Sequence, residues 1–129
     1  MRKMILAGVA IAAATVSTAS AERVQRNAPP PATAVGQPVN CVQLRQIRDT
    51  RVHGDQVIDF HMTGGRVYRN TLPFSCPNLG FEQRFAYKTS LDRLCNVDTI
   101  TVLQSPGLSA GASCGLGQFQ PVQLAKRGR

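Results

Sequence analysis

The chain has 129 residues, 43% of them hydrophobic and 17% charged, and 15 Lys and Arg against 7 Asp and Glu give a formal net charge of +8. This length suits one small domain rather than two, and the apolar fraction is too high for a chain that is disordered throughout. Four cysteines are too few for a knottin-like scaffold.

The first 21 residues predict a secretory signal peptide. Two basic residues open the segment, residues 4–16 are apolar, and Ala19-Ser20-Ala21 supplies the small residues of a cleavage site. A transmembrane anchor is the alternative, but the apolar stretch is too short, because a membrane-spanning helix needs about 20 residues. We expect cleavage near Ala21, a mature protein in the periplasm or outside the cell, and no membrane span after cleavage.

The remaining chain divides into a linker, a domain and a tail. Residues 22–40 contain four prolines among small residues, which predicts an extended, disordered linker that adds little to stability. Residues 41–122 form the single domain, and residues 123–129 form a basic, disordered tail. Most of the excess positive charge lies outside the domain, so we expect no nucleic-acid partner; the partner is left open as an unknown envelope protein or polymer.

Within the domain, apolar and polar residues alternate more often than they recur at helical spacing. One helical turn fits residues 41–47, and the paired glycines Gly64-Gly65 suit the positive φ of a hairpin turn. Strands are expected at residues 47–52, 57–62, 66–69, 81–87, 97–103 and 117–122. Five to six short strands predict an all-β fold: a small antiparallel sheet, barrel or sandwich.

The cysteines are the strongest chemical signal. Cys41, Cys76, Cys95 and Cys114 form an even set in a small exported domain, which predicts two disulfides. Three pairings are possible and the residues do not choose among them; we favour Cys76–Cys95 and Cys41–Cys114, which would join the first element of the domain to the last. No C-x-x-C motif occurs, so we expect no zinc ribbon and no cofactor.

Four spaced segments resemble those of a known domain family: residues 65–73 (GRVYRNTLP), 76–79 (CPNL), 94–102 (LCNVDTITV) and 113–119 (SCGLGQF). The family is a domain of unknown function found in small exported proteobacterial proteins with a similar arrangement of cysteines. The resemblance covers residues 41–122 and implies export and disulfide bonds. It carries over no catalytic or binding residue.

Residues 107–111 (GLSAG) match the G-x-S-x-G pattern of a nucleophile elbow. Such an elbow joins a strand to a helix and needs an acid and a histidine further along the chain. Pro106 precedes the motif, and no Asp, Glu or His follows Ser109. We therefore expect a loop here, and no catalytic residue.

His53, Asp55, Asp59 and His61 cluster within nine residues. Alternation places Asp59 and His61 on one face of a strand, opposite the apolar residues of that strand. Two imidazoles and a carboxylate can bind zinc, and His61 could act as a general base. A metal-binding or acid–base enzyme using His53, Asp59 and His61 is thus the first alternative function, but a solvated polar face explains the pattern more simply and we predict no metal site.

Six arginines would form a basic patch, next to Tyr68 and Phe85, if their strands are adjacent: Arg45, Arg48, Arg51, Arg66, Arg69 and Arg84. Such a face is typical of polyanion-binding modules, which makes polyanion binding the second alternative. Acidic residues interleave in the same strands, namely Asp49, Asp55, Asp59 and Glu82, so we favour cross-strand pairing of these charges. The sequence therefore predicts a non-enzymatic binding or structural module of the cell envelope, with its ligand and oligomeric state open.

Overall fold

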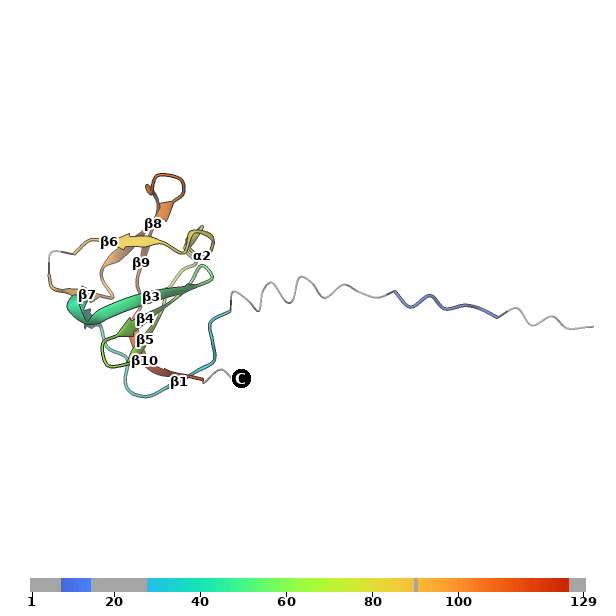
Figure 1. Cartoon of the computed structure of the whole chain (residues 1–129), viewed down its shortest axis with the longest axis horizontal. Helices are drawn as coiled ribbons and strands as arrows, with labels where there is room; N and C mark the ends of the chain where they lie inside the picture. Colours follow the sequence, from blue (N-terminus) through green and yellow to red (C-terminus); the bar gives the residue numbers. More distant parts are fainter. Residues whose placement is uncertain (1–7, 15–27, 90, 126–129) are drawn as a thin grey trace, which may run out of the picture.

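The computed structural model describes residues 8–14, 28–89 and 91–125 and is all-β, with almost no helix in those residues (Figure 1). Its strands form three antiparallel sheets: a five-stranded sheet in the order β1-β10-β5-β4-β3, a two-stranded sheet β2-β7 and a three-stranded sheet β6-β8-β9. The predicted all-β class is confirmed, but the described residues form ten strands in place of the five to six expected, because the additional strands are short or built of small residues. No helix in the described residues is long and apolar enough to cross a membrane.

The strands, in chain order, are β1 (Ala32–Ala34), β2 (Cys41–Gln43), β3 (Ile47–His53), β4 (Val57–Met62), β5 (Val67–Thr71), β6 (Phe85–Tyr87), β7 (Arg93–Cys95), β8 (Thr99–Gln104), β9 (Ser109–Gly115) and β10 (Phe119–Leu124). A 3-10 turn, η1 (Leu44–Gln46), precedes β3, and a four-residue helix, α2 (Leu79–Glu82), precedes β6. The strand expected over residues 81–87 is therefore wrong over residues 81–84, because Phe81 and Glu82 lie in α2 and β6 begins at Phe85. The expected cleavage site at Ala21 lies outside the described residues, as do residues 126–129 of the expected tail.

The predicted hairpin at Gly64-Gly65 joins β4 to β5. Both glycines have positive φ, 86° and 84°, a conformation that other residues rarely adopt. Met62 N–H donates to the Arg66 carbonyl at 2.8 Å, which closes the turn and fixes the register of the two strands. Consequently Asp59 lies directly opposite Arg69 on the neighbouring strand.

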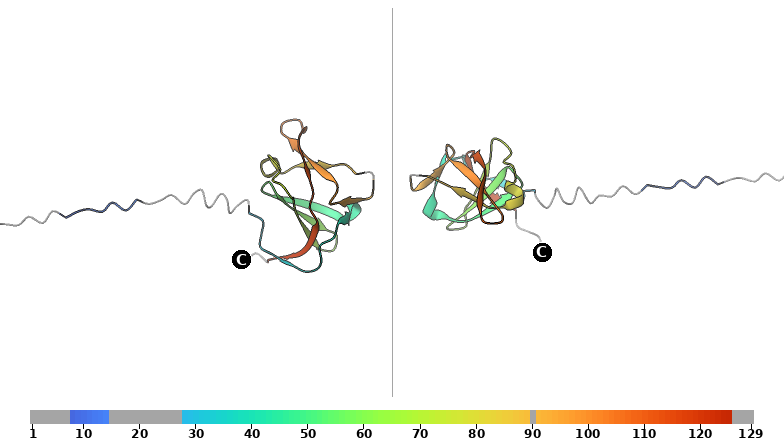
Figure 2. Two further views of the ribbon diagram at one scale, coloured as in Figure 1. Left: turned by 180° about the vertical axis from the view of Figure 1, so that it is seen from behind. Right: turned by 90° about the horizontal axis from the view of Figure 1, so that it is seen from above.

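One hydrophobic core is shared by all three sheets, which wrap around a common interior when viewed from behind and from above (Figure 2). The alternation of β4 turns Ile58, Phe60 and Met62 into this core, where they are almost fully buried. The Phe60 ring packs edge-on against Phe119 and Phe85, with centroids 5.3 and 6.4 Å apart. Edge-to-face pairs of this kind add about 0.5–1.5 kcal/mol beyond area burial.

A buried amide joins β5 to the segment before β10. Asn70 Nδ2 donates to the Gly117 carbonyl at 2.7 Å, and Gly117 N–H donates back to Asn70 Oδ1 at 2.8 Å. A Cβ added at Gly117 would clash with the Thr71 carbonyl oxygen. Only glycine therefore lets the two segments approach closely enough to form this pair of bonds.

Both disulfides are present, but the expected pairing is wrong. The bonds join Cys41 to Cys95 and Cys76 to Cys114, and no described cysteine is free. Cys41 and Cys95 lie directly opposite each other in the β2–β7 pair. The pairing depends on the register of two three-residue strands, which are too short to leave a periodic pattern in the sequence.

The expected disordered linker is wrong over its second half. β1 pairs with β10, with Ala32 opposite Leu124, and Val35 N–H donates to the Pro121 carbonyl at 3.0 Å. Val39 forms a further bridge with Phe119, and β10 runs two residues past the expected domain boundary at residue 122. An edge strand needs a partner on one side only, so a proline-rich segment can dock there without losing hydrogen bonds.

Candidate functional site

A buried ion pair lies on the outer face of the five-stranded sheet. Arg69 Nε donates to Asp59 Oδ1 at 2.8 Å, and Arg69 Nη2 donates to Asp59 Oδ2 at 2.9 Å. The Asp59 side chain is fully buried and that of Arg69 is 16% exposed. The planar guanidinium thus grips both carboxylate oxygens, the bidentate geometry that makes such a pair strong.

His53, at the end of β3, lies against the same carboxylate. Its Nε2 is 3.3 Å from Asp59 Oδ2. Burial lowers the pKa of His53 below its ordinary value of 6.5; the positive charge of Arg69 adds to this, and the negative charge of Asp59 opposes it. The ring is therefore mostly neutral at neutral pH.

The N-terminal segment covers this ion pair. The Pro30 carbonyl accepts a hydrogen bond from Arg69 Nη2 at 2.9 Å, so the guanidinium is held from both sides. β1, two residues further on, pairs with β10 and keeps Pro30 in place. Sequence reasoning missed this contact, because no periodic signal in a proline-rich segment shows where it docks.

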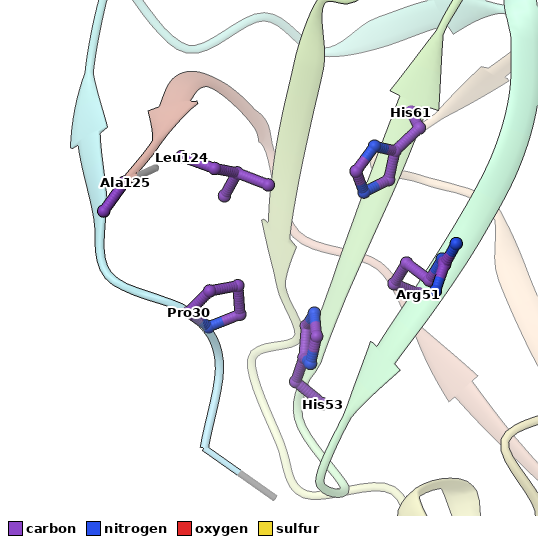
Figure 3. A pocket seen from close by; sticks show the side chains of 6 residues that line it. All are labelled: Pro30, Arg51, His53, His61, Leu124 and Ala125. Atoms are coloured by element: carbon purple, nitrogen blue, oxygen red, sulfur yellow. The ribbon is translucent and has the colours of Figure 1, made fainter. Parts of the chain in front are cut away.

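A hollow of about 270 Å³ opens beside the covered pair, lined by Pro30, Arg51, His53, His61, Leu124 and Ala125 (Figure 3). Figure 3 shows the polar side chains coming from β3 and β4, and the apolar side chains facing them from the end of β10 and the segment before β1. The hollow therefore has one polar wall and one apolar wall, as small-molecule sites commonly do.

A second hollow of about 260 Å³ adjoins the first along β3 and β4, lined by Arg48, Asp49, His61, Met62, Gly65 and Arg66. His61 lines both hollows, so it lies between them. We call the surface made by Arg48, Arg51, His61 and Arg66 the His61 face.

Asp49 is the acidic residue of the two hollows. Its Oδ2 accepts a hydrogen bond from Arg51 Nε at 2.8 Å. That hydrogen bond lowers the pKa of Asp49, so it is a carboxylate at neutral pH. One negative charge therefore stands against three arginines across the two hollows, and the His61 face is positively charged.

Of the histidines and aspartates that cluster in the sequence, the structure brings His53 and Asp59 together and places His61 and Asp55 apart from them. His53 lies opposite Val57, and His61 is four residues further along β4, about 13 Å away at the usual strand rise. Asp55 lies in the turn between β3 and β4, where its Oδ1 accepts the Gly80 N–H of α2 at 2.8 Å. Within residues 8–14, 28–89 and 91–125, no three His, Cys, Asp or Glu side chains lie close enough to hold a metal ion.

Three of the six arginines form ion pairs within the described residues, but among these pairs Arg69–Asp59 alone is the cross-strand pairing that the interleaved acids predict. Their ion pairs are Arg45–Asp92 at 3.9 Å, Arg51–Asp49 at 2.8 Å and Arg69–Asp59 at 2.8 Å. Among these, Arg69–Asp59 is the pair of directly opposed residues on neighbouring strands. Both residues lie five positions from Gly64, whereas counting outward from a two-residue Gly64-Gly65 turn would have placed Asp59 opposite Asn70, so the turn motif alone does not predict this pair.

The G-x-S-x-G motif runs from the connection between β8 and β9 into the start of β9. Gly107 and Leu108 belong to the connection between β8 and β9, as expected, but Ser109 begins β9 opposite Gln104 and is exposed. The motif therefore joins one strand to another, whereas a nucleophile elbow leads into a helix.

Comparison of the chain with protein-family models, curated proteins and solved structures finds no match. The resemblance to a family of exported proteins therefore stays a prediction.

Proposed function

We propose that the protein is an exported, non-enzymatic binding module of the cell envelope, and that its His61 face binds a compact anionic group. The observation that carries this proposal is the position of His61 between two adjoining hollows lined by Arg48, Arg51 and Arg66. Guanidinium groups are the side chains best suited to carboxylate and phosphate oxygens.

The arginines of the His61 face retain donors for a ligand. Arg51 uses its Nε on Asp49, and its Nη atoms make no hydrogen bond to the described residues. Arg48 makes no ion pair within the same residues, and Arg66 makes one long hydrogen bond, 3.3 Å, to Gln46 Oε1. An arginine carries five N–H donors, so most of theirs remain available.

The geometry of the buried Asp59–Arg69 ion pair is better suited to a binding protein than to an enzyme that uses Asp59. Both Asp59 oxygens accept hydrogen bonds from Arg69, and one of them also faces His53. A carboxylate held in this way is poorly placed to accept a proton from a substrate or to ligate a metal ion. The network instead holds Pro30 and His53, two residues that line the first hollow, which favours binding over the metal or acid–base alternative.

Export is supported by the N-terminal sequence pattern and by the two disulfides, since structural disulfides persist in oxidising compartments. Terminal sequencing of protein recovered from the envelope tests this part. We expect the mature chain to begin at Glu22, and a folded cytosolic protein that keeps Met1 would contradict it.

A chemical-shift titration of the mature protein tests the binding site, with D-glucuronate as the anionic probe and D-glucose as its neutral control. We expect saturable glucuronate binding with a Kd of about 1–10 mM and no glucose binding. Arg51→Gln and His61→Gln should each weaken binding about tenfold, because each removes a hydrogen bond to a charged group. Arg45→Gln is the matched control, since Arg45 lies outside both hollows and is exposed.

Two results would contradict the proposal. Equal losses of affinity in Arg45→Gln and Arg51→Gln would show that the probe senses the overall charge. Tight binding of dextran sulfate with a steep salt dependence, without binding of glucuronate, would favour the polyanion alternative.

A further inference from the structure

β9 is an edge strand with one open side. The order of its sheet is β6-β8-β9, so β8 is the one partner strand that β9 has among the described residues. Apart from that pairing, its one other hydrogen bond to the described residues joins the Ser113 and Thr101 hydroxyls, 3.0 Å apart. The N–H and C=O groups on its outer side are therefore free to pair with an added strand.

This edge lacks the features by which other edges of the domain are protected. β3 carries Arg48, Asp49 and Arg51, and charged side chains block the addition of another strand. β1 and β6 are only three residues long. β9 has seven residues, Ser, Ala, Gly and Cys alone, with no charge and no proline.

A groove of about 270 Å³ lies along the second half of β9, lined by Phe74, Ser75, Pro77, Ala112, Ser113, Cys114 and Gly115. The Cys76–Cys114 disulfide ties the loop that forms its far wall to β9. Phe74 stands at the groove with 81% of its surface exposed. The β8–β9 connection projects beyond the rest of the domain, so the outer part of this edge is accessible (Figure 1).

We propose that β9 binds an extended peptide segment of another protein, which adds a strand to the β6-β8-β9 sheet. In this mode, main-chain hydrogen bonds supply affinity, and side chains that enter a neighbouring pocket supply specificity. Here the peptide places an apolar side chain in the groove, against Phe74. This site is separate from the His61 face and does not depend on the function proposed for it.

The volume of the groove favours a peptide from another protein over a second copy of this chain. A second copy pairing through its own β9 would offer only Ser, Ala, Gly and the bonded Cys114. Those side chains are too small to fill a groove of about 270 Å³. A branched or aromatic side chain of a peptide fills it, so the partner carries one near the middle of its strand.

The experiment pans a phage library of random nine-residue peptides against the full mature protein with its disulfides intact. Recovered peptides are then synthesised and measured by fluorescence anisotropy and by hydrogen exchange. We expect peptides with a central apolar residue, and slower exchange of amides in residues 109–115 when they bind. Phe74→Ala should weaken binding about tenfold, and a new charge in Ala110→Lys should weaken it as well.

Phe81→Ala is the matched control, because Phe81 is 83% exposed and lies on α2 outside the groove. It should leave peptide affinity unchanged within about twofold. Failure to recover peptides, protection elsewhere than β9, or equal losses in both Phe variants would each overturn the proposal. A dimer in light scattering whose β9 amides are already protected would assign the edge to a second copy and overturn it too.

Discussion

Removing the Asp59 carboxylate should destabilise the protein more than any change to an exposed charge. Asp59→Ala leaves the Arg69 guanidinium, which is 16% exposed, with the Pro30 carbonyl as its remaining hydrogen-bond partner. Breaking a buried ion pair from one side costs about 3–5 kcal/mol, since the remaining charge stays desolvated. For an ordered domain of this size, each kcal/mol lowers Tm by about 4–8 °C, so the expected drop exceeds 10 °C.

Urea denaturation of the mature protein, followed by circular dichroism with disulfides intact, measures this change. The double variant Asp59→Leu/Arg69→Leu should recover a large part of the loss, because it removes both charges together. Asp49→Asn is the control: it removes the exposed aspartate that pairs with Arg51, and the midpoint should stay within error of the wild-type value. An Asp59→Ala midpoint equal to that of Asp49→Asn would refute the reasoning, since the ion pair would then contribute no more than an exposed one.

Three further predictions concern the parts that support the site. Deleting residues 22–37 should lower the free energy of unfolding by about 1–3 kcal/mol, because it removes β1 and the Pro30 carbonyl that accepts a hydrogen bond from Arg69. An unchanged urea midpoint would mean that this segment does not pack against the domain. Because the pKa of His53 is lowered in the folded protein, the unfolded chain takes up a proton on this residue as the pH falls below 6.5, whereas the folded protein does not. The contribution of His53 to the free energy of unfolding is therefore fully present above pH 6.5. It declines below that pH until His53 is protonated in the folded protein as well. His53→Gln should flatten that part of a stability-versus-pH curve, and an unaltered slope would exclude His53 as its cause. Gly117→Ala should cost about 1–3 kcal/mol through its clash with the Thr71 carbonyl, whereas Gly115→Ala, whose added Cβ meets nothing within 4 Å, should leave Tm unchanged in the same thermal scan.

The sequence predicted best the strands whose alternation reflects burial on one face. β4 buries Ile58, Phe60 and Met62 and β8 buries Ile100 and Val102, apolar residues at every second position, so their pattern and their structure agree. β1 and β9 consist of small residues and were missed, since they are held by main-chain pairing rather than by burial of large side chains. Pairing of main-chain groups leaves no mark on residue type.

The strand face that carries each residue of the site could be predicted from the sequence, but the long-range contacts that bring these residues together could not. Alternation correctly placed Asp59 and His61 on the face opposite the apolar residues of β4. Burial of Asp59 depends on Arg69 across the hairpin and on Pro30 folding back over it, from 29 residues earlier in the chain. The prediction of the disulfide pairing was wrong for the same reason. The burial of Asp59 and the pairing of the cysteines both depend on how distant strands are aligned, which local sequence patterns do not encode.

The central claim, that the His61 face binds a compact anion, is tested most directly by NMR of the histidine rings. Long-range proton–nitrogen spectra of the mature protein would follow the His61 and His53 imidazoles as D-glucuronate is added at constant pH and ionic strength. We predict that the His61 ring signals shift and saturate with the same Kd as the Arg51 side-chain Nε signal, and that D-glucose moves neither. His61 signals that stay fixed while amides elsewhere saturate would contradict the claim and place the anion at another surface.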